Sequence, residues 1–100
     1  MKLRLQPELF FVGIMSCRIV STVMSGYDGH RGWIYYLAVD PDFQQNGIGR
    51  RMVEKVEMKL RKLVCSKINL QVRNSNKSVI AFYKHMGFGN DDVLGMGKRL

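Results

Sequence analysis

A chain of 100 residues that is 46% hydrophobic is long enough for one domain with a core, and it is too apolar for a disordered tail. No apolar run approaches the roughly 20 residues of a membrane-spanning helix, and residues 1–6 lead into no apolar segment with a cleavage site, so we expect neither a membrane anchor nor a signal peptide. A net charge of +8 favours an anionic partner: nucleic acid, an acidic membrane or a polyphosphate cofactor.

The cysteines and histidines do not form a metal-binding pattern. Cys17 and Cys65 have no CxxC partner, and His30 and His85 have no ligand spacing around them. We therefore interpret the two cysteines as buried, reduced thiols of a cytoplasmic protein, and we expect no metal.

The first half of the chain predicts strands and turns. Strand-forming residues fill residues 8–15 and 18–24, and the break at Ser16-Cys17 joins these segments as a hairpin. A loop with three glycines follows at residues 25–32. The run WIYYLAV (33–39) is apolar without alternation, which predicts a strand buried on both faces that ends before Pro41.

The second half predicts two amphipathic helices, residues 49–64 and 77–86, with a strand at residues 68–72 between them. The apolar stripe of the first helix consists of Met52, Val53, Val56, Leu60, Leu63 and Val64. Gly87 fits the left-handed position that ends the second helix, with Phe88 as the apolar contact after it. We expect residues 92–98 to form a last strand.

The resulting order, β-β-β-α-β-α-β, predicts a single α/β (α+β) domain over residues 1–100. Three strands in series favour an antiparallel part of the sheet. The strand–helix–strand unit from Trp33 to Val72 adds one parallel pair with a right-handed crossover. We therefore expect a mixed, mainly antiparallel sheet with helices against it.

The stretch QQNGIGR (44–50) lies between a predicted strand and a predicted helix. The first N–H groups of a helix carry the positive end of its dipole, and Gly47 and Gly49 let the backbone approach a ligand closely. Arg50 and Arg51 add charge that suits phosphate. Neither a Walker loop nor the dinucleotide fingerprint is present. A phosphate-binding site and a plain turn are both consistent with this stretch.

A second group of candidate residues begins the second predicted helix. Asn76 stands where this helix starts, so it is a candidate N-cap. Tyr83 lies on the apolar stripe, where a tyrosine is more often a core residue than a catalyst. Taken alone, this segment is ambiguous too.

Together the two segments resemble the GNAT N-acetyltransferase family. The spacing of Gln44, Gly47 and Gly49 at a strand–helix junction is similar to the acyl-CoA pyrophosphate loop of that family. The pattern Asn76-x-Ser78 followed by Tyr83 and Gly87-Phe88 is similar to its second signature. Both occur in the family's order, and the resemblance covers residues 33–88.

The flanking segments GYDGHRG (26–32) and VLGMGKRL (93–100) look like the YpeA-type bacterial members of the family. The resemblance implies a GNAT-like acyl-CoA N-acyltransferase fold that lacks the family's first strand and two helices, which normally wall the acceptor site. The chain is then a truncated product, a natural minimal form, or one that completes its site with another subunit. Such a sheet exposes apolar surface and favours self-association, for example as a homodimer.

The resemblance implies acetyl-CoA as the cosubstrate. Backbone N–H groups of the loop would bind its pyrophosphate, and its pantetheine arm would pair with the edge of the strand that ends at Val39, in the manner of an added strand. Asn76 would hydrogen-bond the arm, and the Tyr83 hydroxyl would point at the sulfur. The implied cofactor-binding residues are Leu37, Ala38, Val39, Gln44, Gln45, Asn46, Gly47, Ile48, Gly49, Arg50, Asn76, Ser78 and Tyr83.

The implied reaction is direct attack of a neutral amine on the thioester carbonyl. Backbone N–H groups near Leu37 would stabilise the oxyanion. A free tyrosine has a pKa of about 10, so Tyr83 is protonated at neutral pH and can act as the general acid. Many family members carry a glutamate where this chain has Trp33. The base is therefore open between Asp28, His30 and a water held by backbone, and Asp28 and His30 also suit a simple turn.

Three functions are consistent with these residues. The leading one is an acetyl-CoA-dependent N-acetyltransferase, whose acceptor amine the sequence leaves open. The second is a non-catalytic acyl-CoA binding module. The third is a small basic nucleic-acid binder, which the residues disfavour because the cations are spread over Arg50–Lys62 and both ends of the chain, without an RNP-like strand or a zinc pattern.

Overall fold

A computed structural model describes residues 2–6, for which only the backbone is considered, together with residues 9–44 and 46–100. In these residues five strands form one sheet in the order β1-β2-β3-β4-β5. The strands are β1 (Lys2–Gln6), β2 (Phe10–Met15), β3 (Arg18–Tyr27), β4 (Gly32–Val39) and β5 (Ile68–Leu70). A 3₁₀ turn η1 (Pro41–Phe43) and the helices α1 (Ile48–Lys62) and α2 (Lys77–His85) complete the fold.

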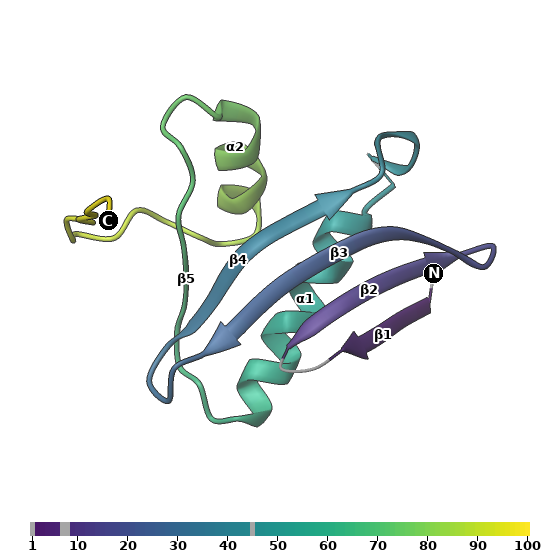
Figure 1. Cartoon of the computed structure of the whole chain (residues 1–100), viewed down its shortest axis with the longest axis horizontal. Helices are drawn as coiled ribbons and strands as arrows, with labels where there is room; N and C mark the ends of the chain where they lie inside the picture. The colour runs from purple at the N-terminus through teal and green to yellow at the C-terminus, as the bar shows by residue number, and fades with distance from the viewer. Residues whose placement is uncertain (1, 7–8, 45) are drawn as a thin grey trace.

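The sheet is mixed, as predicted. The pairs β1–β2, β2–β3 and β3–β4 are antiparallel, and β4 pairs with β5 in parallel (Figure 1). The hairpin turn falls at Ser16 and Cys17, which both adopt positive φ, as the tight turn between β2 and β3 requires. Because Cys17 lies in this turn it is exposed, and Cys65 is only partly buried, so the prediction of two buried cysteines is wrong. The predicted α/β (α+β) class is therefore confirmed.

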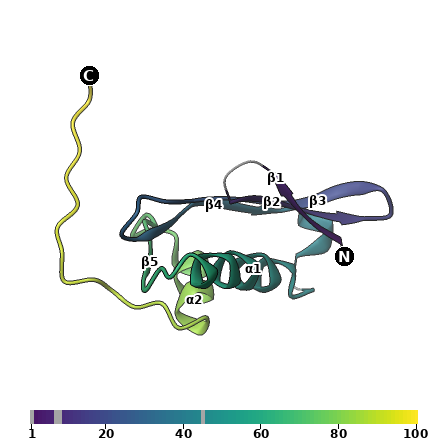
Figure 2. The same ribbon diagram turned by 90° about the horizontal axis from the view of Figure 1, so that it is seen from below.

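Two ends of the predicted order differ from the structure. Residues 2–6 form β1 and pair with β2, so a strand precedes the hairpin although the sequence analysis placed the first strand at residue 8. Residues 92–98 form no strand, and the prediction of a last strand there is wrong. This segment carries exposed side chains and extends away from the sheet, so it lacks the neighbouring strand that would fix an extended pairing (Figure 2).

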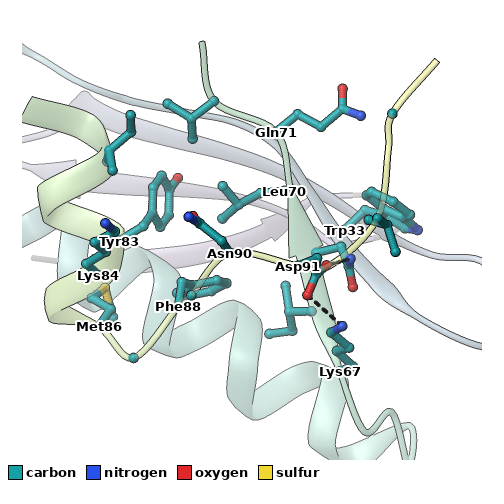
Figure 3. Close-up of a pocket in the computed structure, with 18 of the residues that line it drawn as sticks. Trp33, Lys67, Leu70, Gln71, Tyr83, Lys84, Met86, Phe88, Asn90 and Asp91 are labelled. Atoms are coloured by element: carbon teal, nitrogen blue, oxygen red, sulfur yellow. Dashed lines mark hydrogen bonds and ion pairs between the residues drawn. The ribbon is translucent and has the colours of Figure 1, made fainter. Parts of the chain in front are cut away.

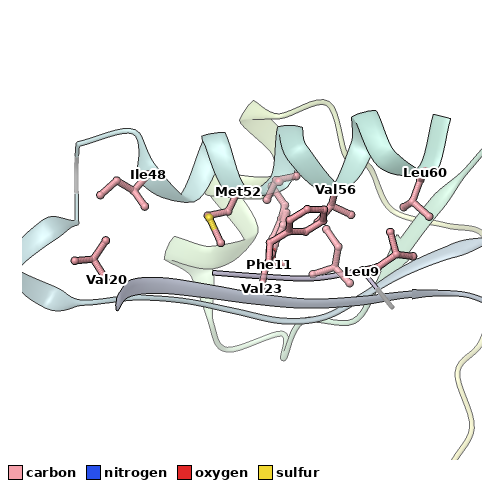
Figure 4. Close-up of a cluster of buried hydrophobic side chains, with 11 residues drawn as sticks. Leu9, Phe11, Val20, Val23, Ile48, Met52, Val56 and Leu60 are labelled. Atoms are coloured by element: carbon pink, nitrogen blue, oxygen red, sulfur yellow. The ribbon is translucent and has the colours of Figure 1, made fainter. Parts of the chain in front are cut away.

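The core lies between the sheet and α1 (Figure 4). From α1 come Ile48, Met52, Val53, Val56 and Leu60, at the spacing of one helical face. Phe11, Val20, Val23 and Ile34 come from the strands. Each such side chain contributes about 1.5–3 kcal/mol when fully buried, so this layer is the main source of stability.

The predicted stripe of α1 extends too far. Leu63 and Val64 are 42% and 89% exposed, because the helix ends at Lys62 and these two residues belong to the turn that leads to β5. Val64 adopts a φ of 60°, the left-handed conformation that reverses the chain.

The strand β4 is not buried on both faces, contrary to the prediction. Tyr35 and Tyr36 are 62% and 44% exposed. Figure 2 shows α1 and α2 on one side of the sheet, and in the described chain no helix covers the other side. Apolar surface is therefore exposed there, as expected, and self-association through it stays a prediction.

Candidate functional site

The sheet opens between β4 and β5. The two strands pair only where Gly32–Ile34 lie beside Ile68–Leu70. Beyond this point, among the described residues, the edge of β4 that faces β5 carries no strand from Tyr35 to Val39. Backbone groups along that edge are available to a ligand that pairs like a strand. Leu37, Ala38 and Val39 lie on this open edge.

The loop after β4 leads to the N-terminus of α1. Gly47 is the N-cap of α1 and adopts a φ of 74°, a conformation that glycine enters without strain. A Cβ at this position would meet no heavy atom within 4 Å, so the demand for glycine is conformational. No side chain caps the helix at Gly47, which leaves the first N–H groups of α1 facing the loop.

Gly49 joins the loop to the other predicted segment. A Cβ at this position would lie 3.3 Å from Cζ of Phe82 and 3.8 Å from Cδ2 of Leu37. The absence of a side chain therefore lets α1 pack closely on both β4 and α2. This contact brings together the glycine loop, the open edge of β4 and the second signature.

The other residues of the loop and of the first turn of α1 differ in what they contact. Gln44 turns back, because its Nε2 donates to the carbonyl oxygen of Val39 at 3.2 Å. Asn46 is exposed beside Gly47, whereas Gln45 lies outside the described residues. Arg50 reaches α2, where its guanidinium donates to the carbonyl oxygen of His85 at 3.4 Å. Arg51 is exposed on the first turn of α1.

Asn76 begins α2 as predicted, but it caps the helix through its backbone. Its carbonyl oxygen accepts the N–H of Ile80, and its side chain makes no capping bond to the helix. The hydroxyl of Ser78 donates to its Oδ1 at 3.5 Å. Both side chains are exposed to solvent.

Tyr83 is buried, with only 7% of its surface exposed. Its ring makes edge-to-face contacts with Phe82 and Phe88, at centroid separations of 5.0 and 5.3 Å. Burial raises the pKa of its hydroxyl, which therefore stays protonated at neutral pH. Figure 3 shows this hydroxyl pointing away from Phe88.

The end of α2 holds Tyr83 in place. Gly87 has a φ of 94°, as predicted for the left-handed position. The N–H groups of Phe88 and Met86 both donate to the carbonyl oxygen of Tyr83, and the Gly87 N–H donates to that of Lys84. This is a Schellman motif, and the ring contact between Tyr83 and Phe88 is its apolar component.

The carboxylate of Asp28, one of the candidate bases, is hydrogen-bonded within its own loop. Its carboxylate accepts the backbone N–H groups of His30 and Arg31 and the indole N–H of Trp33, at 2.8, 2.7 and 3.2 Å. These bonds, led by that from Arg31, lower the pKa of Asp28 to about 2. A carboxylate with so low a pKa is a weak base, so Asp28 acts here as a turn residue.

A groove of about 1390 Å³ lies between β5, the C-terminal part of α2 and residues 87–97 (Figure 3). Tyr83 and Trp33 contribute to its wall, and the glycine loop does not. Lys67 pairs with Asp91 at 2.8 Å, and the amide of Asn69 donates to the same carboxylate at 2.6 Å. The sequence analysis did not anticipate this group, because residues 67 and 91 have no local pattern that links them.

Two other features were sought in the described residues: a metal-binding group and a membrane-spanning helix. Within the described part of the chain, no group of three or more His, Cys, Asp or Glu side chains is placed to hold a metal ion. Neither helix of the described residues combines the length and the apolar character needed to cross a membrane.

Known proteins resemble this chain in sequence and in fold. The Acetyltransferase (GNAT) family matches residues 4–88. An acetyltransferase of Yersinia enterocolitica is 44% identical over 99 residues, which are 99% of this chain and 70% of that protein. The structure of the ribosomal-protein-S18-alanine N-acetyltransferase of Escherichia coli superposes with a TM-score of 0.75 at 28% identity, covering 86% of this chain and 57% of that enzyme.

A further similarity concerns the fold alone. The aminoglycoside N-acetyltransferase AAC(6')-Iy, solved in complex with CoA, superposes with a TM-score of 0.78 at 15% identity, over 91% of this chain and 75% of that chain. The family match covers most of the present sequence, and the Yersinia protein is similar over nearly all of it. The chain belongs to the acetyltransferase (GNAT) family.

Proposed function

We propose that this protein transfers the acetyl group of acetyl-CoA to the nitrogen of a primary amine. The observation that carries the proposal is the close packing at Gly49, where α1 meets Leu37 of β4 and Phe82 of α2. That contact sets a helix N-terminus with uncapped N–H groups beside an open strand edge. An anionic head and an extended polar arm, both present in acyl-CoA, match these two features.

The pyrophosphate would bind at the N-terminus of α1. The backbone N–H groups of residues 45–50 would donate to its oxygens, with the helix dipole favouring the negative charge. Gly47 adopts the left-handed conformation at the start of α1. Arg51 adds positive charge at the same end.

The pantetheine arm would run along β4 from the loop toward β5. Its amides would pair with the open edge at Leu37, Ala38 and Val39, and Asn76 with Ser78 would bond the arm from the side of α2. The thioester would then lie near Tyr83. Gln44, fixed to the carbonyl of Val39, would line the turn between arm and pyrophosphate.

In the reaction, the amine nitrogen forms a bond to the thioester carbon and the carbon–sulfur bond breaks. Backbone N–H groups near Leu37 would stabilise the oxyanion, at about 3 kcal/mol for one donor. Tyr83 would give its proton to the leaving thiolate, and its raised pKa keeps the hydroxyl protonated until that step. The proton that the attacking nitrogen releases would pass to His30 or to a backbone-held water, since Asp28 is a weak base.

A non-catalytic acyl-CoA binding module is the second candidate. It is favoured by Trp33, which replaces the acidic residue of many family members, and by the low pKa of Asp28. Both candidates require cofactor binding, and only the first requires turnover with an amine.

The proposal is tested by calorimetric titration of acetyl-CoA into the 100-residue chain, followed by a screen of primary amines for release of free CoA thiol. We expect saturable micromolar binding and turnover with at least one amine class. Binding without any turnover would favour the binding module. A folded protein that binds no acetyl-CoA would contradict both candidates.

The role of Tyr83 is tested separately by Tyr83→Phe. We expect acetyl transfer to slow about a hundredfold while the dissociation constant of CoA stays within about twofold, because only the proton donor is removed. Tyr27→Phe, which alters another partly buried tyrosine packed against the core, serves as the control. An unchanged rate for Tyr83→Phe would remove Tyr83 from the mechanism.

A further inference from the structure

Asp40 anchors the loop between β4 and α1 through four hydrogen bonds. Its Oδ1 accepts the N–H of Asp42 at 2.9 Å, and its carbonyl oxygen accepts that of Phe43 at 2.8 Å. Its own N–H donates to the carbonyl of Val20 at 2.7 Å. Asp40 thus begins η1 as its N-cap and ties the turn to β3.

The fourth bond comes from a distant part of the chain. Arg18, the first residue of β3, donates from Nη2 to Oδ2 of Asp40 at 2.7 Å. The same guanidinium lies over the ring of Phe43, with Cζ 5.3 Å from the ring centroid. One side chain therefore contacts both the first and the last part of the 3₁₀ turn.

The consequence concerns the residues that follow this turn. Phe43 packs against the core, and Gln44 next to it bonds back to Val39. The direction in which the chain leaves η1 determines where Gly47 and the N-terminus of α1 present their N–H groups. The Arg18–Asp40–Phe43 cluster is thus the support beneath the loop.

We propose that Arg18 and Asp40 are positioning residues that hold the β4–α1 loop in the shape that receives the pyrophosphate of acyl-CoA. This inference rests on the proposed function. Neither residue needs to touch the ligand. Because the Arg18 side chain is 56% exposed, the ion pair adds little to global stability, so its loss acts mainly on the loop.

The structure offers a matched control for this inference. Lys67 and Asp91 form an ion pair of similar length, 2.8 Å against 2.7 Å, and of similar exposure, 52% and 33% against 56% and 27%. That pair lies beside β5 and the C-terminal segment, away from the loop. Breaking it removes an equivalent surface interaction without altering the proposed support.

The test compares Asp40→Asn, Arg18→Gln and Lys67→Gln by calorimetric titration of CoA, with thermal unfolding of each variant alongside. We expect Asp40→Asn and Arg18→Gln to weaken CoA binding about five- to tenfold, the size of the effect of losing a typical hydrogen bond, with small changes in Tm. Lys67→Gln should leave the dissociation constant unchanged. Arg18→Lys, which keeps the charge but not the planar contact with Phe43, should recover part of the affinity.

Each other outcome has a definite meaning. If the wild-type chain binds no CoA, the proposed function fails before the variants are compared. If the wild type binds CoA and all variants bind equally well, the positioning role is overturned. Equal weakening by Asp40→Asn and Lys67→Gln would also overturn it, since the effect would then be a general loss of stability.

Discussion

The two ends of helix α1 both pass through left-handed backbone, but they use opposite residue types. At the N-terminal end the left-handed residue is Gly47, with open space around it and no capping side chain. At the C-terminal end it is Val64, a β-branched residue that is strained at a φ of 60°. The helix therefore tolerates strain where nothing is to bind and avoids it where the proposed ligand approaches.

The surroundings of the two ends differ in the same way. Near the N-terminus, Gly49 makes room for Phe82 and Leu37, and the loop is supported by Arg18 and Asp40. At the C-terminus the chain closes on itself, as the N–H of Cys65 donates to the carbonyl of Leu60 and that of Val64 to Arg61. One end leaves backbone N–H groups for the proposed ligand, and the other satisfies its own backbone groups.

The largest effect on stability is expected at the C-terminal end of the buried face. Leu60 is 1% exposed, and a Cβ on Gly32 would lie 2.5 Å from its Cδ1, so the residue opposite it is already the smallest possible. Leu60→Ala should lower the free energy of unfolding by about 3–4 kcal/mol, because Gly32 has no side chain with which to fill the cavity. Urea denaturation measures this loss. In folded protein, CoA affinity should be unchanged, and a parallel loss of affinity would show that the two ends are coupled.

The largest effect on the ligand is expected at the N-terminal end. Gly47→Val should weaken CoA binding at least about a hundredfold, because valine disfavours the left-handed conformation that presents the first N–H groups of α1. Calorimetric titration measures the change.

Gly97→Val is the control, since Gly97 also has open space around its Cβ position but lies in the C-terminal segment. Affinity that survives Gly47→Val would exclude the loop as the pyrophosphate site. Affinity that falls equally in Gly97→Val would mean that the loss is not specific to the loop.

This contrast also explains how much was predictable from sequence. The buried face of α1 was found because Met52, Val56 and Leu60 recur at helical spacing, a signal that is local. The loop was found from the spacing of Gly47 and Gly49. Leu63 and Val64 were assigned to the core by the same periodicity, because a valine gives no sign that the chain reverses at its position.

The missed features depend on contacts between distant residues. Arg18 and Asp40 are 22 positions apart and meet only because β3 and β4 are paired; the one local signal was the sequence Asp40-Pro41, typical of an N-cap followed by proline. The exposure of Tyr35 and Tyr36 follows from both helices lying on one side of the sheet (Figure 2) and from a register shift at Tyr35, where Met24 pairs with Tyr36 and Ser25 with Ile34. An apolar run reveals neither feature. The strand β1 is an exception, since it pairs locally with β2, with Gln6 opposite Phe10, and the alternation of Leu3 and Leu5 with charged residues was a local signal that the sequence analysis did not use.

Reversing a positive charge should have opposite effects on stability at the two ends of α1, and only the change at the N-terminal end should weaken CoA binding. Arg51→Glu should weaken CoA binding about three- to tenfold, most at low salt, because it places a negative charge where the pyrophosphate would lie. The same change should slightly raise helix stability, since a carboxylate favours the N-terminal end of the dipole. Lys62→Glu should do the reverse, lowering stability slightly without affecting CoA. Titrations at two salt concentrations and thermal unfolding decide between this pattern and a non-specific loss of positive charge.

The smallest effect is a gain at the C-terminal end. Val64→Gly should stabilise the fold by about 1 kcal/mol, because a left-handed non-glycine residue costs roughly 1–2 kcal/mol and the added freedom of the unfolded chain offsets part of the relief. For a domain of this size the gain corresponds to a rise in Tm of roughly 4–8 °C. Val64 is 89% exposed, so little buried surface is lost. CoA affinity should not change, and Val64→Ala, which keeps a Cβ in the left-handed conformation, should give a smaller rise. A Val64→Gly protein no more stable than the parent would mean that left-handed backbone costs little at this position, and that the two ends of α1 do not differ in strain.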